Sequence, residues 1–447
     1  MNSAAVDIAA EVARMPGKPV SLPGSGSVAV PRLNSRASTL RRALSFAGPG
    51  YLVAVGYMDP GNWATSLAGG SAFGYSLLSV VLLSNVMAML LQAAAVRLGI
   101  VSGLDLAQSC RRHFSSYVNF TLWFGCEVAV VACNLAEVLG MACGLALLFN
   151  IPLPIGVCIT AADVFLLLGL QRRGVRQFEG LIIALVALIG ACFAVQIWWL
   201  QPSAAAVAAG FVPTIQILSS SQMLYLAVGI IGATVMPHNL YLHSAIVKSR
   251  QHERCERGIR QAIRFATLDS NVALGFALFV NVGIMVLAAG AFNRPGEAPV
   301  ATLEDAYRML SPLLGVSAAS TVFGIALIAS GLSSSITGTL AGQVVMEGFL
   351  ELRVSRIKRA VLTRCLAIGP AVAIAATMGN AGVGRLLVFS QVILGLQLPF
   401  AVVPLLWFTT RPKHLGVHAF SRLTSIALWS VAAVLILVNL WVIYVLL

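Results

Sequence analysis

Two short stretches, Met58-Asp59-Pro60-Gly61-Asn62-Trp63 and Met236-Pro237-His238-Asn239, decide the fold, because each interrupts a long apolar run. Proline breaks the hydrogen-bond ladder of a helix, and an ionisable group at membrane depth is costly. A lone proline often only kinks a helix, but a kink needs no neighbouring Asp or Asn. Both runs are therefore predicted to be discontinuous helices with functional, unwound centres.

The remaining sequence is that of an all-α polytopic membrane protein. Of the 447 residues, 58% are hydrophobic and 10% charged, whereas soluble domains carry about 25% charged residues. This composition excludes a soluble globular enzyme. Eleven apolar runs are long enough to span a bilayer, near residues 46–68, 73–97, 118–149, 151–170, 179–200, 222–247, 268–292, 313–346, 361–379, 384–408 and 423–447.

The basic residues predict the topology. If the N-terminus lies in the cytoplasm, only Arg294, Arg308 and Arg385 of the 29 Lys and Arg fall on the opposite side. This asymmetry is the positive-inside pattern, so the net charge of +13 requires no nucleic-acid partner. We expect a multi-pass protein of the plasma (inner) membrane with a cytoplasmic N-terminus and, after eleven crossings, a C-terminus on the opposite side.

The interrupted runs are the first and the sixth, which predicts an inverted repeat. Matching interruptions in two halves of five helices are typical of transporters whose second half is upside down relative to the first. We expect a disordered cytoplasmic tail at 1–44, five-helix repeats at 45–210 and 211–410, and a cytoplasmic loop with an eleventh transmembrane helix at 411–447.

The interruptions bring together ligands for a cation. Asp59 offers a carboxylate, Asn62 an amide oxygen and Met236 a thioether, and the broken helices free backbone carbonyls. Oxygen ligands alone suit Mg²⁺ or Ca²⁺, whereas a thioether favours Mn²⁺, Fe²⁺, Co²⁺ or Cd²⁺. The alternative for Met236 is a flexible residue that fills a gap between helices.

A second set of residues could move protons. Glu137 is a mid-span carboxylate and His238 lies beside the proposed metal ligand. Arg250 and Arg364, at the cytoplasmic ends of their spans, either pair with buried carboxylates along an inward route or serve as positive-inside anchors.

Three segments together resemble the Nramp family of proton-coupled divalent metal transporters: 58–63, 232–239 and the run Ser333-Ser334-Ser335-Ile336-Thr337-Gly338-Thr339-Leu340-Ala341-Gly342-Gln343. The resemblance implies a LeuT-type fold. It also implies that metal is held by Asp59, Asn62, Met236 and the carbonyl of Ala233, with Gln391 as a secondary ligand.

The third span departs from the family pattern at one position. Where the family typically has Asp-Leu-Ala-Glu in the third span, this chain has Asn134-Leu135-Ala136-Glu137. Asn cannot take up and release a proton, so either Glu137 and His238 suffice for coupling or metal uptake is less tightly coupled here.

We therefore expect a secondary transporter that imports Mn²⁺ or Fe²⁺, and also Cd²⁺ or Co²⁺, with protons. The ion is a substrate; no cofactor is expected, and a monomer would suffice. Two alternatives stay open: an amino-acid or sodium-coupled symporter of the same fold, and a membrane metal sensor or metalloenzyme. The sequence offers the latter no nucleophile–base pair and no sizeable soluble domain.

Overall fold

The computed structural model describes residues 28–31, 38–162, 169, 175–300, 302–351 and 355–446. Most of these residues are helical. The α-helices are α2 (Thr39–Phe46), α3 (Pro49–Ala54), α4 (Pro60–Phe73), α5 (Leu78–Ser102), α6 (Leu106–His113), α7 (Ser116–Phe149), α8 (Leu153–Thr160), α10 (Val175–Leu200), α11 (Ala204–Gly210), α12 (Gln216–Ser219), α13 (Ser221–Val235), α14 (Pro237–Ile246), α15 (Glu256–Phe292), α16 (Leu303–Leu314), α17 (Ala319–Leu350), α18 (Arg356–Thr377), α19 (Gly379–Thr409), α20 (Pro412–Leu415) and α21 (Arg422–Leu446). The short 3₁₀ helices and strands are η1 (Val55–Met58), η2 (Gly74–Leu77), η3 (Val247–Ser249), η4 (Gly416–His418), β1 (Val28–Ala29) and β2 (Arg250–Gln251).

Eight helical segments of the described chain are long and apolar enough to cross a membrane. They differ from the eleven predicted runs at three places. Pro60–Ser102 joins the second half of the first run to the second run, and the ninth run appears as the shorter apolar helix Val361–Thr377. The fourth run, 151–170, lies partly outside the described residues. The chain is a multi-pass membrane protein.

The first and sixth runs are broken where the sequence predicted. Asp59 is extended and caps α4, with Pro60 at the first helical position. Met236 separates α13 from α14, which again begins with a proline, Pro237. Proline is favoured at this position because its missing N–H would have no partner in the first turn. Each helix therefore ends and restarts within one or two residues.

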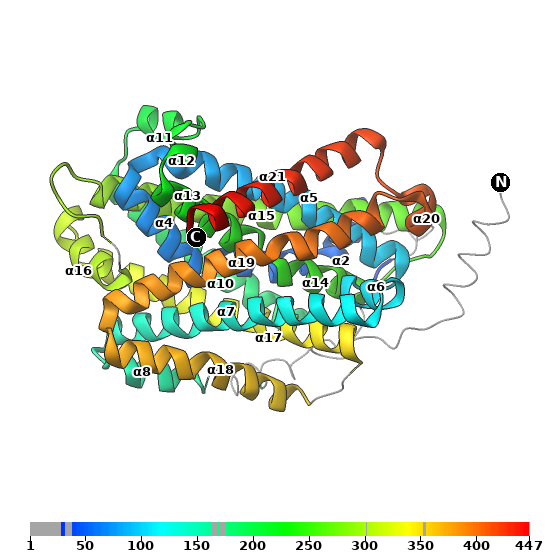
Figure 1. Ribbon diagram of the computed structural model, residues 1–447, viewed down its shortest axis with the longest axis horizontal. Helices are drawn as coiled ribbons and strands as arrows, with labels where there is room; N and C mark the ends of the chain where they lie inside the picture. Colours follow the sequence, from blue (N-terminus) through cyan, green and yellow to red (C-terminus); the bar gives the residue numbers. More distant parts are fainter. Residues whose placement is uncertain are drawn as a thin grey trace.

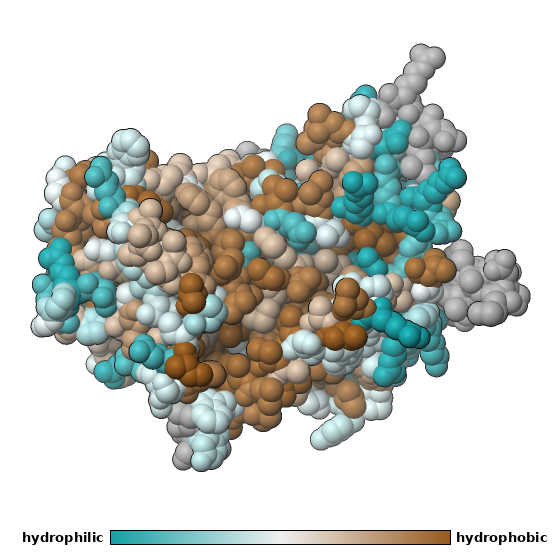
Figure 2. Space-filling view, turned by 90° about the horizontal axis from the view of Figure 1, so that it is seen from above, coloured by the Kyte–Doolittle hydropathy of each residue, from teal (hydrophilic) through white to brown (hydrophobic). Residues whose placement is uncertain are grey.

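The two breaks lie in the middle of the helical bundle. The broken helices pack on each other through α4 and α13, and α7 and α19 cover α4. α7 and α17 run side by side, with α18 and α8 outside them, and α21 lies against α13 and α19 on the other side (Figure 1). Figure 2 shows a broad band of hydrophobic side chains across the middle, with hydrophilic side chains towards both ends. This distribution fits a bilayer around the middle of the bundle.

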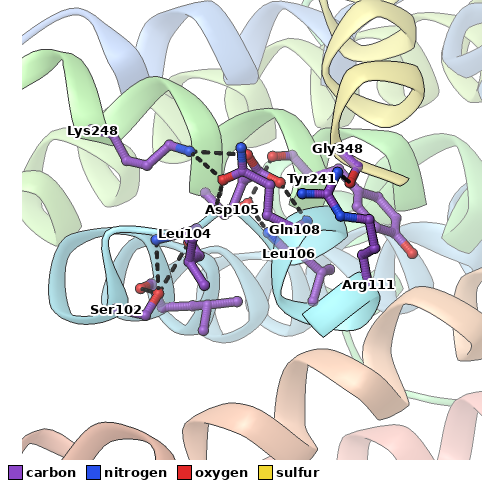
Figure 3. A network of polar contacts seen from close by, with 11 residues as sticks. Ser102, Leu104, Asp105, Leu106, Gln108, Arg111, Tyr241, Lys248 and Gly348 are labelled. Carbon is purple, nitrogen blue, oxygen red and sulfur yellow. Dashed lines mark hydrogen bonds and ion pairs between the residues drawn. The ribbon is translucent and has the colours of Figure 1, made fainter. Parts of the chain in front are cut away.

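A polar network ties three segments together at the end of the molecule that carries α6 (Figure 3). Lys248 pairs with the fully buried Asp105, which caps α6, at 2.9 Å. The Leu106 amide donates to Ser244 Oγ of α14 at 2.9 Å, and Arg111 donates to the Gly348 carbonyl of α17 at 2.8 Å. The ends of α14 and α17 are thereby fixed to α6.

The predicted tail, 1–44, is not entirely disordered. Residues 1–27 and 32–37 lie outside the described residues, but β1 pairs in parallel with β2, and α2 begins at Thr39. The Ser38 side chain caps α2 by accepting from the Arg41 amide at 3.2 Å. Phe46, at the end of α2, is buried against α15. A helix cap and one buried aromatic ring order a segment that composition alone marks as polar.

Candidate functional site

Three of the residues expected at the metal site form one hydrogen-bonded chain across the two breaks. Asp59 Oδ1 accepts from both the backbone amide and the side-chain Nδ2 of Asn62, each at 2.9 Å. The same Nδ2 donates to the carbonyl oxygen of Ala233 in α13 at 2.7 Å. Asp59 and Ala233 are fully buried, and Asn62 is 1% exposed. The break in the first run thus contacts the break in the sixth directly.

This geometry makes two oxygen atoms converge on a single atom. Asp59 Oδ1 and the Ala233 oxygen both face Asn62 Nδ2, whose two N–H bonds supply the positive partial charge between them. If the Asn62 amide turned over, its oxygen would face two other acceptors, an arrangement that a cation between them would stabilise. The convergence is therefore suited to a small positive ion.

Gln391 lies against the same carboxylate. A Cβ on Gly61 would stand 2.9 Å from Asp59 Oδ2 and would overlap the Gln391 side-chain amide. The absence of a side chain at Gly61 therefore allows Gln391 to approach the break. Asp59 Oδ2 and Gln391 Oε1 are both buried, and neither has a hydrogen-bond partner among the described residues. The Gln391 side-chain amide thus lies next to the Asp59 carboxylate at the break.

Met236 is fully buried in the second break. Its side chain lies in a small apolar cluster with Ala132, Cys133 and Leu394. Asn239 donates from Nδ2 to Met236 Sδ at 3.5 Å. Asn239 was not singled out from the sequence, although it belongs to the same interrupting motif. The feature of the sequence that could have identified Asn239 is its position, a polar residue one helical turn after the expected ligand.

Glu137 and Arg364, both expected in a proton route, lie together. Glu137 of α7 is fully buried, and Arg364 Nη1 of α18 lies 3.6 Å from its Oε2. Arg364 also donates to Ser335 Oγ of α17. Cys133, one turn before Glu137, donates to Glu137 Oε1 at 3.5 Å. Asn134 is buried and donates from Nδ2 to the Val130 carbonyl of its own helix at 2.8 Å.

The other two residues of the expected proton route have different surroundings. Arg250 is 1% exposed and pairs with Glu179 of α10 at 2.6 Å. It also donates to the Ala47 carbonyl, just before α3, at 2.8 Å. His238 is 1% exposed in α14, and its Nδ1 has no hydrogen-bond partner in the described part of the chain.

A buried ion pair was missed in the sequence. Arg359 of α18 holds Glu127 of α7 with two short contacts, 2.7 and 2.8 Å, and the side chains are 7% and 17% exposed. A carboxylate at membrane depth, such as Glu127, requires a partner, but the sequence offers five basic residues near the ninth run that could each pair with it. Only the packing of α18 against α7 identifies the partner.

The chain matches the family model described as Nramp, natural resistance-associated macrophage protein-like, over residues 50–445. The chain belongs to the Nramp family. A relative from Bradyrhizobium diazoefficiens, named divalent metal cation transporter MntH, is 56% identical over 400 residues, covering 90% of this chain and 89% of the relative.

Solved structures agree with this assignment. The crystal structure of the Eremococcus coleocola manganese transporter is 39% identical, has a TM-score of 0.84 and covers 93% of this Nramp chain and 89% of its own. MhsT in complex with L-phenylalanine is 16% identical with a TM-score of 0.61, covering 89% of this chain and 97% of its own, so this similarity concerns the fold alone. The fold is the LeuT-type inverted repeat with broken helices one and six and an eleventh transmembrane helix.

Proposed function

We propose that this Nramp-family protein imports divalent transition-metal ions, Mn²⁺ or Fe²⁺, across the plasma (inner) membrane. The ion binds between Asp59, Asn62, the Ala233 carbonyl and Met236, with Gln391 as a secondary ligand. The observation that carries the proposal is the convergence of Asp59 Oδ1 and the Ala233 oxygen on one atom, at 2.9 and 2.7 Å. A metal ion takes the place of the amide N–H groups when Asn62 turns its oxygen inward.

The donor set supports a transition metal over Mg²⁺ or Ca²⁺. Four of the ligands are oxygens, which every divalent cation accepts, whereas the Met236 thioether contributes mainly to softer ions. The names of the relatives agree: one is a divalent metal cation transporter and another a manganese transporter. Mn²⁺ and Fe²⁺ bind similar ligands, so cellular supply decides between them.

The broken helices supply the movement. Ionised Asp59 attracts the hydrated ion between the two repeats, 45–210 and 211–410, and the ion exchanges most of its water for the ligands. Rocking of the broken helices then opens the site to the cytoplasm. The excess of basic residues at the α6 and α20 end supports a cytoplasmic N-terminus and, after eleven crossings, a C-terminus on the opposite side.

Protons take a separate route past Glu137. The contact with Arg364 at 3.6 Å supports an ionised Glu137 at rest, and protonation releases the arginine. His238, beside Met236, provides a second titratable group, and Asn134 stands where a relay carboxylate would. Arg250, paired with Glu179, belongs to the cytoplasmic end of this proton route. Each proton entering with the membrane potential contributes about 2.3 kcal/mol per 100 mV.

Uptake into proteoliposomes tests the proposal. Mn²⁺, Mg²⁺ and Ca²⁺ entry and internal pH are recorded for the unmodified protein and for Asp59→Ala, Met236→Ala and Asp305→Asn. We expect Mn²⁺ entry with acidification, its loss in Asp59→Ala, and easier entry of Ca²⁺ or Mg²⁺ in Met236→Ala. Asp305, in the first turn of α16 and outside the site, accepts from the Thr302 hydroxyl; Asp305→Asn is the control and should transport normally.

Each result that departs from this expectation removes a defined part of the proposal. Mn²⁺ entry without acidification would remove proton coupling and leave an uncoupled metal carrier. Unchanged selectivity in Met236→Ala would remove the thioether argument. No Mn²⁺ entry, with amino acids protecting the site from labelling, would favour the symporter of the same fold.

A further inference from the structure

A basic cavity of about 420 Å³ lies away from the metal site, between α5, α15 and the η4 segment. Three arginines line it, Arg97, Arg260 and Arg264, together with His418, and no acidic side chain of the described residues does. Arg97 comes from the end of α5 and the other two from the first turns of α15. The cavity therefore gathers positive charge from distant parts of the sequence.

The arginines are arranged to receive an anion. Arg97 donates to the His418 carbonyl at 2.9 Å and stacks on the Phe420 ring at 3.9 Å, so its position is fixed. Arg264 is exposed and has no ion-pair partner among the described residues. Within the described part of the chain, Arg260 pairs only with Glu256, and both side chains are more than 60% exposed. Such a surface pair contributes little and exchanges readily.

His418 lies beside these arginines. Burial lowers the pKa of His418 below its usual range; Glu256 opposes this shift, and Arg260 and Arg97 add to it.

An apolar surface continues directly from the cavity along α15. Arg260, Arg264, Leu268 and Val272 follow one another at intervals of four residues, so they lie on one face of the helix. Leu268 is 53% exposed and Val272 51% exposed. Charged residues thus give way to apolar ones over two turns, in the direction that leads from the end of the helix into the bilayer.

We propose that this cavity binds the phosphate-bearing headgroup of an anionic phospholipid, whose acyl chains lie along Leu268 and Val272. A free phosphate ion would use the arginines but would gain nothing from the apolar face. A headgroup with attached chains uses both, and basic pockets at the ends of transmembrane helices are typical binding sites for such lipids. The site is independent of the proposed metal ligands.

Native mass spectrometry of the detergent-solubilised full chain with phosphatidylglycerol or cardiolipin tests this. The double variant Arg260→Ala/Arg264→Ala is compared with Arg257→Ala/Arg294→Ala, which removes two arginines that do not line the cavity. We expect the unmodified protein and the control pair to retain anionic lipid, and the cavity variant to bind on the order of 10- to 30-fold more weakly.

Two outcomes would overturn the proposal. Equal lipid retention by the cavity variant and the control pair would show that charge alone, without the cavity, holds the lipid. Displacement of the lipid by millimolar inorganic phosphate would assign the arginines to a soluble anion. As a second readout, phosphatidylglycerol should raise the melting temperature of the unmodified protein and of the control pair, and not that of the cavity variant.

Discussion

Replacing Gly232 by Ala should disable the metal site without changing any proposed ligand. Gly232 precedes Ala233 and faces the backbone of α19, where a Cβ would overlap the Gln391 carbonyl oxygen and stand 2.8 Å from Gly395 Cα. Carbon atoms in contact normally lie about 3.5 to 4.0 Å apart, so α13 and α19 must separate by about 1 Å. Both helices carry proposed ligands, and a displacement of about 1 Å in a preorganised site can cost on the order of 100-fold.

The assay is initial Mn²⁺ uptake into proteoliposomes at low ion concentration, with thermal unfolding as a check on folding. Gly229→Ala, one turn earlier on α13, is the matched control. The nearest atoms to its Cβ would be two side-chain methyl groups, Thr65 Cγ2 at 3.1 Å and Val392 Cγ2 at 3.7 Å, which can adjust. The uptake rate should fall about 10- to 100-fold in Gly232→Ala and less than about twofold in the control. Equal rates in the two variants would refute the role of this backbone contact.

Three further substitutions test other parts of the structure. Glu127→Gln leaves the Arg359 charge buried without its partner, so the free energy of unfolding should fall by about 3 kcal/mol in thermal and denaturant measurements. The exposed control Glu256→Gln should lose less than about 1 kcal/mol, and equal losses would contradict the buried pair. Asp105→Asn keeps a helix cap but removes the 2.9 Å ion pair with the lysine, so the free energy of unfolding should fall by about 1 to 3 kcal/mol. An unchanged melting temperature would argue against the network in Figure 3. Asn134→Asp adds a second carboxylate one turn before Glu137, so internal acidification per Mn²⁺ should rise, and an unchanged ratio would show that the position carries no protons.

The breaks were predictable because their signal is local. A proline beside Asp or Asn within an apolar run has few explanations, and the equal spacing of two such motifs indicates a repeat. The structure indeed joins Asp59, Asn62 and Ala233 in one hydrogen-bonded chain. The roles of these residues in metal binding are still a prediction from chemistry and resemblance.

Partners between distant helices were not predictable. Arg359 and Glu127 are 232 positions apart, and Arg250 and Glu179 are 71 apart. Charge counting cannot separate a paired arginine from a membrane anchor, because the positive-inside rule depends only on the side on which a residue lies. Whether an arginine turns inward depends on which helices pack together. The order within the tail was missed for the same reason, since β1 exists only through its pairing with β2.

The surroundings of Glu137 limit how protons can move in the proposed cycle. The Asn134 amide is committed to the Val130 carbonyl at 2.8 Å, so this side chain cannot relay a proton between the metal site and Glu137. Transfer must then depend on Glu137 itself, which Arg364 contacts at 3.6 Å and Cys133 at 3.5 Å. A carboxylate held by a cation accepts a proton only when that contact loosens. Proton entry should therefore depend on movement of α18 relative to α7, whereas binding at the breaks, which involves α4, α13 and α19, should not. Metal binding and proton entry would then be separable by mutation at Arg364.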